Sequence, residues 1–321
     1  MKVLVFGGET IASLHNLRGA RLYVKVSEDN LRRIISLGNT LAKSRNRYEV
    51  GNITKIIKQD FIIEEPYLLE MLYLSEGSKY ITRIVKFDDD HYLMTDVDGI
   101  KWIIRKAFPA LKDDIIFGPL LSHRQEPEEY VWFLNALHRD GTFIDVGANV
   151  GGYTIRACKM GARAIALEPD PDNYHVLKAN LELNQCTGAH ALNIAAGGKE
   201  EVRQLYQDDK ASPSGYTLEK GEGRKVKCYV KVETLDAAIT PLLGDEWVDL
   251  LKIDVEGSEL EVIKGALNLL KRTRHVIVEV IPSTESKILK VLKLLRPMGF
   301  NLIDKVCRHS LYCDLFLSRY I

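Results

Sequence analysis

Apolar residues in the second half of the chain follow two alternating patterns. Segments with apolar residues at helical spacing predict helices near residues 150–160, 171–184, 258–271 and 284–296. Short apolar runs between them predict strands near residues 142–147, 163–168, 189–195, 248–254, 274–281, 299–306 and 311–318. Strands that alternate with helices form a parallel sheet with both faces covered, so the pattern predicts an α/β domain.

The last two predicted strands are joined by only about four residues. A parallel connection needs a long crossover, so the final strand is expected to run antiparallel to its neighbours. The pattern therefore predicts six parallel strands and a seventh, antiparallel strand.

The first part of the chain has a different pattern. Apolar residues recur at helical spacing over 29–42, and Asp98-Gly99 is typical of a hairpin between strands near 92–95 and 100–104. A helix is expected over 127–137. We therefore predict an accessory α+β domain over residues 1–120 and the α/β domain over residues 121–321.

Residues 198–245 interrupt the alternation of strands and helices with turn-rich sequence, and only 225–232 alternates as a strand. This insertion predicts a hairpin with a mobile loop. The sequence leaves open whether it covers a substrate or is a passive surface excursion.

The stretch from Phe143 to Thr154 predicts a strand, a glycine turn and a helix, which is the form of a nucleotide-binding loop. The spacing from Gly147 to Gly151 differs from the G-x-G-x-x-G of dinucleotide sites, and a Gly-Lys-Ser/Thr phosphate loop is absent. Asp145 precedes the turn and would repel a pyrophosphate. An acid here suits a cationic nucleoside such as S-adenosylmethionine, with its sulfonium and amino group.

Glu168 ends the next predicted strand, 23 residues after Asp145. An acid at about this distance along the chain receives ribose hydroxyls in nucleotide-binding folds, and a carboxylate can accept from both hydroxyls. The alternative for Glu168 is a helix-capping or surface acid. Asp145 and Glu168 at the ends of consecutive strands favour the nucleoside site.

A third acid-rich segment runs from Val248 to Glu259. A buried strand delivers Asp254 at its carboxyl end, where ligands bind in open α/β sheets, so Asp145, Glu168 and Asp254 are expected to face one crevice. Glu259 begins a helix, where capping alone explains an acid. Lys252 either takes part in the chemistry or supports an acid through an ion pair. Glu279, within the next apolar strand, needs a partner, which is either Lys252 or the substrate.

The motifs Asp145-Val-Gly-Ala-Asn149-Val-Gly151, Glu168-Pro169 and Lys252-Ile-Asp-Val-Glu256-Gly-x-Glu resemble those of the FkbM family of S-adenosylmethionine-dependent methyltransferases. The resemblance covers roughly residues 90–310. It implies a seven-stranded, Rossmann-like class I methyltransferase sheet and methyl transfer to a hydroxyl of a sugar or natural product.

The same resemblance implies that the glycine loop with Asn149 holds the methionine end of the cofactor and that Glu168 holds its ribose. The predicted cofactor-binding residues are Asp145, Gly147, Asn149, Gly151, Tyr153, Glu168 and Asp254.

Methyl transfer to a hydroxyl requires an aligned acceptor and a base that removes the proton. Asp254 and Glu256 are the candidates for the base or for acceptor orientation, with Lys252 beside them as a third catalytic candidate. Asp254, Glu256 and Glu279 are also hard oxygen ligands, but nothing in their spacing demands a metal, and none is expected.

Composition limits the other classes of function. The formal net charge is zero and the pI is about 7.1, which argues weakly against a large nucleic-acid surface. No apolar run approaches the roughly 20 residues that cross a bilayer, and the N-terminus predicts a strand rather than a signal peptide. We therefore expect a cytoplasmic protein that does not bind membranes.

The expected partner is a hydroxylated small-molecule or glycan acceptor. RNA methylation, at the ribose 2′-hydroxyl rather than at a base nitrogen, is the second possibility, and a nucleoside-binding regulator without catalysis is the third. The five scattered cysteines are expected to be thiols, because their number is odd and the protein is expected to be intracellular.

Overall fold

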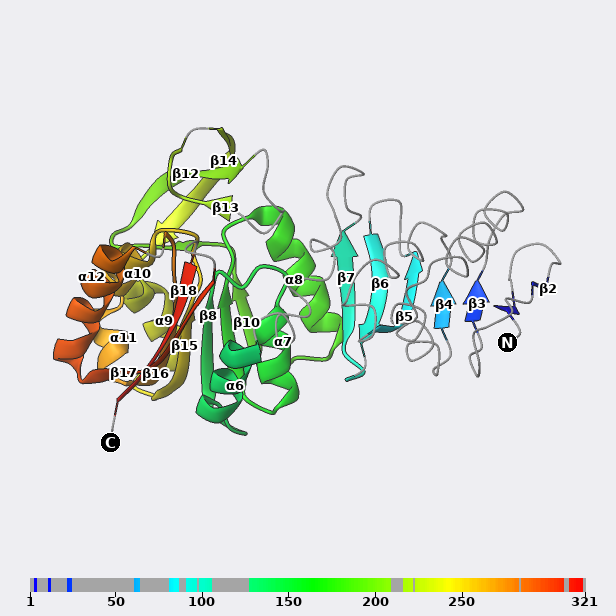
Figure 1. Cartoon of the computed structure of the whole chain (residues 1–321), viewed down its shortest axis with the longest axis horizontal. Coiled ribbons are helices and arrows are strands. Elements are labelled where there is room, and N and C mark those ends of the chain that lie inside the picture. Colours follow the sequence, from blue (N-terminus) through cyan, green and yellow to red (C-terminus); the bar gives the residue numbers. More distant parts are fainter. Residues whose placement is uncertain are drawn as a thin grey trace, which may run out of the picture. The chain divides into compact units, whose positions relative to one another are not determined.

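The computed structural model divides the chain into two compact units, Met1–Leu121 and Ser122–Ile321, each described here by itself (Figure 1). The described residues are 3–4, 11–12, 22–24, 61–63, 81–86, 91–96, 98–105, 127–208, 216–221, 223–282, 284–308 and 312–319. The helix expected over 29–42 lies outside them.

The N-terminal unit contains two small sheets. The strands β1 (Val3–Leu4), β2 (Ile11–Ala12), β3 (Leu22–Val24) and β4 (Phe61–Ile63) form one sheet in the order β2-β1-β3-β4. The strands β5 (Ile81–Lys86), β6 (His91–Asp96) and β7 (Lys101–Arg105) form the other.

The expected hairpin is confirmed, since β6 and β7 pair antiparallel around Gly99, whose φ is 78°. Asp96 stabilises this turn because its carboxylate accepts the backbone N–H of Asp98 and of Ile100 and the indole N–H of Trp102, at 3.0, 2.9 and 3.1 Å.

The second unit is built on a seven-stranded sheet in the order β10-β9-β8-β15-β16-β18-β17. These strands are β8 (Thr142–Val146), β9 (Arg163–Leu167), β10 (Ala189–Leu192), β15 (Val248–Ile253), β16 (Thr273–Val280), β17 (Phe300–Arg308) and β18 (Tyr312–Arg319). Only β18 runs antiparallel, and it lies between β16 and β17. The predicted class I methyltransferase sheet, with six parallel strands and one antiparallel strand, is confirmed.

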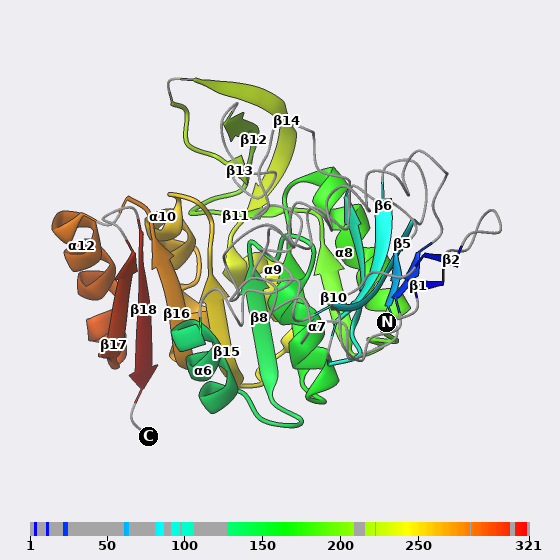
Figure 2. The same ribbon diagram turned by 45° about the vertical axis from the view of Figure 1, so that its right-hand side comes forward.

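Helices cover both faces of this sheet (Figures 1 and 2). The helices α6 (Pro127–Ala136) and α7 (Gly152–Lys159) pack on one face, where an aromatic cluster includes Phe133, Phe143 and Phe316. The helices α9 (Leu235–Leu243), α10 (Glu259–Lys264), α11 (Leu267–Lys271) and α12 (Glu285–Leu295) pack on the other, against a cluster of branched aliphatic residues.

Local sequence sets several helix boundaries. Helix α8 (Pro171–Leu183) begins after Asp170, whose carboxylate accepts the Asn173 N–H at 2.9 Å. The single helix expected over 258–271 is wrong, because the chain forms α10 and α11 with a break at Gly265. A Cβ there would lie 2.0 Å from the carbonyl oxygen of Gly197, so the backbones are in close contact. The pattern analysis also missed α9.

The insertion forms a separate four-stranded sheet in the order β11-β14-β12-β13. Its strands are β11 (Ala195–Ala196), β12 (Glu201–Asp208), β13 (Tyr216–Thr217) and β14 (Arg224–Glu233). The expected hairpin is present as β12 and β14, which pair antiparallel. One face of the sheet buries its own small apolar cluster, including Leu205, Tyr216 and Val230. We call this element the inserted sheet.

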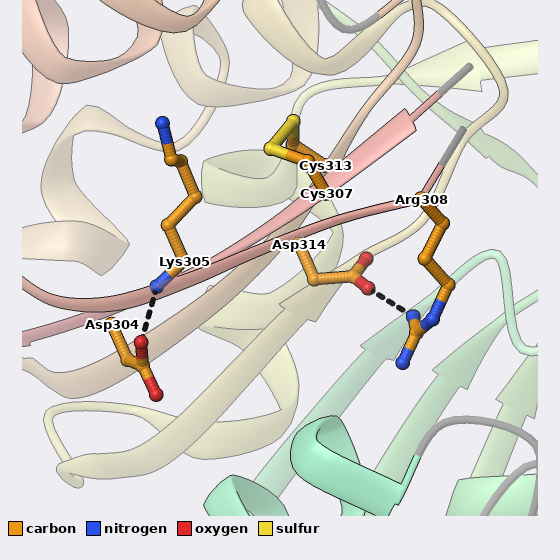
Figure 3. Close-up of a disulfide and its surroundings, with 6 residues drawn as sticks. All are labelled: Asp304, Lys305, Cys307, Arg308, Cys313 and Asp314. Carbon is orange, nitrogen blue, oxygen red and sulfur yellow. Dashed lines mark hydrogen bonds and ion pairs between the residues drawn. A yellow bond between two sulfur atoms is a disulfide. The ribbon is translucent and has the colours of Figure 1, made fainter. Parts of the chain in front are cut away.

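The expectation that all cysteines are thiols is wrong, because Cys158 is bonded to Cys186 and Cys307 to Cys313. The first pair is separated by 28 residues and joins α7 to the turn between α8 and β10, so the tertiary structure brings the two cysteines together. The second pair joins directly opposed positions on β17 and β18 (Figure 3). Cys228 is the free cysteine of the described part of the chain.

Within the described residues, no helix combines the length and the apolar character needed to span a membrane.

Candidate active site

Three parallel strands end at the same level. Val146, the last residue of β8, lies opposite Leu167 of β9 and opposite Ile253 of β15. The residues that follow, Gly147, Glu168 and Asp254, therefore leave the sheet side by side at its carboxyl edge. Asp145, which the sequence analysis placed at this edge with Glu168 and Asp254, lies within β8 and is buried, so a crevice shared by the three acids stays a prediction.

The glycine loop after β8 has a shape that its sequence requires. Gly147 has a φ of 87°, and a Cβ on it would lie 1.7 Å from the carbonyl oxygen of Asp254. Gly151 has a φ of 97°, and a Cβ there would lie 2.7 Å from Leu177 Cδ1. Asn149 also lies in the left-handed region, with a φ of 52°. A side chain at Gly147 would force the loop away from the backbone of Asp254, and one at Gly151 would strain a left-handed backbone and displace the end of the Leu177 side chain.

Glu168 holds this loop through its carboxylate. Its Oε2 accepts the backbone N–H of Asn149 at 2.8 Å, and its Oε1 accepts that of Asp170 at 2.9 Å. The side chain is 4% exposed. Burial raises the pKa of Glu168 to about 8, although the two backbone hydrogen bonds favour the anion. Each oxygen keeps a second lone pair for a ligand donor.

A row of polar side chains lies on the α6 face of the sheet. Strand alternation puts Asp145 on the same face as Phe143, Lys252 with Leu250, Glu279 with Ile277 and Asp314 with Phe316. These four residues occupy the neighbouring strands β8, β15, β16 and β18, near the carboxyl edge of the parallel strands. The first and last of these residues, Asp145 and Asp314, lie more than 160 positions apart in the sequence. The row is therefore apparent only from the order of the strands.

Lys252 is the cation at the centre of this row. Its ammonium lies 2.7 Å from Asp254 Oδ2, 3.5 Å from Glu129 Oε1 and 5.0 Å from the centre of the Tyr153 ring. Burial disfavours the charge, but Asp254 and Glu129 outweigh it and raise the pKa of Lys252 well above its usual value. Lys252 therefore stays charged, and the ion-pair role considered for it is present.

Glu129, on α6, was missed by the sequence analysis. It is 2% exposed, and burial raises its pKa although Lys252 favours its anion. It shares the buried face of α6 with Trp132, Phe133 and Ala136. Glu129 precedes these apolar residues by three, four and seven positions, which is the spacing of one helix face. An acid on the apolar face of a predicted helix is the signal that would have identified it.

Asp254, Glu256 and Glu279 form a cluster whose carboxylate oxygens lie within 4.8 Å of one another. Burial and the neighbouring Asp254 raise the pKa of Glu279 well above its usual value, and Glu279 donates a hydrogen bond to Asp254. Burial would raise the pKa of Asp254, but Lys252 and this hydrogen bond lower it. The partner of Glu279 is therefore Asp254, rather than Lys252 as considered above. Three such oxygens are also able to hold a cation.

Glu256 differs from the other two acids of the cluster. Burial and the charge of Asp254 raise its pKa to about 8, close to neutral pH. Its backbone is left-handed, with a φ of 52°. Left-handed conformations are uncommon for residues with a side chain and are concentrated at functional sites.

Glu259 begins α10 as expected, but its carboxylate holds the loop before the helix rather than an N–H of the first turn. Its Oε1 accepts the N–H of Gly257 at 2.8 Å, and its Oε2 lies 2.5 Å from the ammonium of Lys287 on α12. The carboxylate thus connects the loop between β15 and α10 to helix α12.

Asp145 and Tyr153 lie deeper than the loop that they flank. Asp145 is 2% exposed, accepts a hydrogen bond from the Thr154 hydroxyl at 2.5 Å and has a pKa raised to about 6 by burial. The Tyr153 ring packs edge-on against Phe133, with centroids 5.2 Å apart. Both support the walls of the site, and their contact with a cofactor stays a prediction.

Residues 145–302 match the model of the methyltransferase FkbM domain. The resemblance to the FkbM methyltransferase family is confirmed over these residues. The matched segment contains the glycine loop, Glu168 and the Asp254–Glu259 loop, which are the residues that the sequence resemblance rested on.

The chain is 30% identical to methyltransferase sdnD of Sordaria araneosa, over 42% of this chain and 64% of that protein. It is 28% identical to the hexuronic acid methyltransferase AglP of Haloferax volcanii, over 54% of this chain and 68% of that protein. The chain thus spans about two thirds of the length of these relatives. It also resembles the structure of Aeropyrum pernix fibrillarin with bound S-adenosylmethionine, at 12% identity over 74% of this chain and 98% of that one, with a TM-score of 0.41.

S-adenosylmethionine is the cofactor of this family, and the residues present fit it. The sulfonium and amino group carry positive charge, and the crevice edge carries Glu168, Asp254 and Glu256. Each carboxylate oxygen of Glu168 keeps a lone pair for a ribose hydroxyl, and the lowered pKa of Asp254 keeps a negative charge at this edge.

Proposed function

We propose that this chain transfers a methyl group from S-adenosylmethionine to a hydroxyl oxygen of a sugar or a small hydroxylated molecule. The observation that carries the proposal is the meeting of Gly147, Glu168 and Asp254 at one sheet edge, with Glu256 beside them. The name of the relative AglP, a hexuronic acid methyltransferase, supports a sugar as the acceptor class.

In this proposal, the glycine loop from Gly147 to Gly151 and Asn149 hold the methionine end of the cofactor. Glu168 accepts the ribose hydroxyls with the lone pairs that its two backbone hydrogen bonds leave unused. Asp145 and Tyr153 hold the base of the loop. When bound, the cofactor supplies an electrophilic methyl group to an in-line acceptor.

Glu256 is the proposed general base, which removes the proton of the acceptor hydroxyl. A base works best when its pKa lies near the working pH, and the pKa of Glu256 is raised to about 8. Asp254 has a lowered pKa and an ion pair with Lys252, so it is a weak base. Its proposed role is to orient the acceptor hydroxyl, with Lys252 and Glu129 fixing its position.

The proposal is tested by incubating the full chain with S-adenosylmethionine and a panel of neutral sugars, uronic acids, hydroxylated natural products and RNA transcripts. Release of S-adenosylhomocysteine together with a methyl ether on a sugar or small molecule is the expected result. If RNA ribose alone is methylated, the proposed sugar or small-molecule acceptor is wrong and RNA takes its place. Binding of S-adenosylmethionine without turnover on any acceptor would contradict the proposal that the chain is an enzyme.

The expectation that no metal takes part stays a prediction, because Asp254, Glu256 and Glu279 are close enough to share one ion. Activity that is unchanged after chelation and dialysis would support it. Loss of activity that returns with a divalent cation would overturn it.

A further inference from the structure

The inserted sheet contacts the loop that carries Glu256. Thr217 of β13 is 3% exposed, and its hydroxyl donates to the carbonyl oxygen of Glu256 at 2.7 Å. The same hydroxyl accepts the backbone N–H of Glu219 at 3.0 Å. One side chain therefore ties the inserted sheet to the backbone of the proposed base.

Glu219 makes a second set of contacts to this loop. Its Oε1 accepts a hydrogen bond from the Ser258 hydroxyl at 3.1 Å, and its Cγ would lie 3.1 Å from a Cβ on Gly257. Arg224 of β14 donates to the carbonyl oxygen of Glu219 at 2.7 Å. These contacts enclose the turn from Glu256 to Ser258 on the side of the inserted sheet.

The enclosed turn needs such support. Glu256 and Gly257 have consecutive positive φ values of 52° and 122°. A residue with a Cβ seldom adopts this conformation unless its surroundings hold it there. Glu259 supports the turn from the side of α10, and Thr217 supports it from the inserted sheet.

The inserted sheet also reaches the other side of the crevice. Lys227 of β14 lies 2.7 Å from Asp172 Oδ2 and 3.9 Å from Asp170 Oδ2, at the start of α8. The backbone N–H of Asp170 in turn donates to Glu168. One small sheet is thus fastened to the loop of the proposed base and to the loop of the proposed ribose acceptor.

We infer that the inserted sheet is a fixed wall of the active site that positions Glu256, with Thr217 and Arg224 as its positioning residues. This inference rests on the proposed function and deepens it, because it assigns the insertion a part in proton removal. It also favours an anchored wall over a passive surface excursion.

The charges around Glu256 give Arg224 a measurable effect. Asp254 on the same loop and Glu259 on α10 disfavour the anion of Glu256, whereas Arg224 and Lys252 favour it. Glu279 on β16 also faces Glu256, but its raised pKa keeps it protonated. Removing the Arg224 guanidinium therefore raises the pKa of Glu256 further. The midpoint of the pH dependence of kcat/KM is expected to move upward in Arg224→Gln.

The geometric part of the inference is tested without turnover. Hydrogen–deuterium exchange of the peptide around residues 254–260 is compared in the wild-type chain, Thr217→Val, Thr217→Ser and Lys231→Met. Thr217→Val removes the hydroxyl at nearly constant volume and should speed exchange. Thr217→Ser keeps the hydroxyl and should behave as wild type. Lys231→Met is the matched control, since Lys231 lies on β14 and is 62% exposed.

Turnover gives the second measurement. Thr217→Val is expected to lower kcat by about tenfold or more while the affinity for S-adenosylmethionine, measured by calorimetry, stays within about twofold. Equal exchange in Thr217→Val and wild type, or an unmoved pH midpoint in Arg224→Gln, would overturn the inference. If the wild-type chain methylates no acceptor, the proposed function fails, and the exchange measurement still decides whether the inserted sheet holds the turn.

Discussion

Glu168 connects the stability of the ligand-free protein to the binding of its cofactor. It is 4% exposed, and its pKa rises from 4.5 to about 8. An acid with a raised pKa holds its proton in the folded chain at pH values where the unfolded chain has released it. The free energy of unfolding therefore falls as pH rises between these two values, by about 1.4 kcal/mol for each pH unit and about 5 kcal/mol in total.

The variant Glu168→Gln removes this titration. Its amide has one acceptor oxygen, so one of the two backbone N–H groups, of Asn149 or Asp170, loses its partner at a cost of about 1–3 kcal/mol. At pH 5 the variant should be less stable than wild type by about that amount. Between pH 5 and 8.5 the wild type loses about 4 kcal/mol as its buried carboxyl ionises, so at pH 8.5 the variant should be more stable by about 1–3 kcal/mol.

The assay is urea denaturation of the ligand-free full chain between pH 5 and 8.5, followed by far-UV circular dichroism. The control is Glu182→Gln, which neutralises an exposed acid on α8. Calorimetry in parallel should show weaker binding of S-adenosylmethionine to Glu168→Gln at pH 8.5. Stability curves for Glu168→Gln and wild type that run parallel across this pH range would refute the reasoning, since Glu168 would then not hold an extra proton in the folded state.

Three other predictions follow from the same site. Asp254→Asn should abolish turnover while S-adenosylmethionine still binds, and unchanged turnover would remove Asp254 from the mechanism. Lys252→Met should lower the free energy of unfolding by about 3–5 kcal/mol, because buried Glu129 and half-buried Asp254 lose their cation; a urea midpoint equal to wild type would contradict this. The value of kcat/KM should rise with pH up to about 8, the pKa of Glu256, since the base acts as an anion. The midpoint of the pH dependence of kcat should lie at a lower pH than that of kcat/KM, because bound S-adenosylmethionine is a cation and favours the Glu256 carboxylate. Identical midpoints would count against Glu256 as the base.

The sequence by itself determined the features that depend on neighbouring residues. Apolar runs and helical spacing gave the α/β alternation, the glycines at 147 and 151 gave the loop, and the short link before residue 311 gave the antiparallel last strand. The acids at residues 168 and 254 were placed at strand ends because each directly follows an apolar run. Strand ends meet at one edge of any parallel sheet, so their convergence followed from local pattern alone.

Only the tertiary structure decided which distant residues meet. The position of β18 between β16 and β17, the partner of Glu279, the approach of Glu129 from α6 and the two disulfides all depend on strand order and helix packing. The helical and strand periodicities of the sequence do not contain this information. They show which face of an element a side chain occupies, but the order of the strands determines which residues lie beside it on that face. The pKa of Glu256 is raised by burial first and then by Asp254 and Glu259, which lie in the same segment, so here the tertiary structure decides the burial rather than the neighbouring acids.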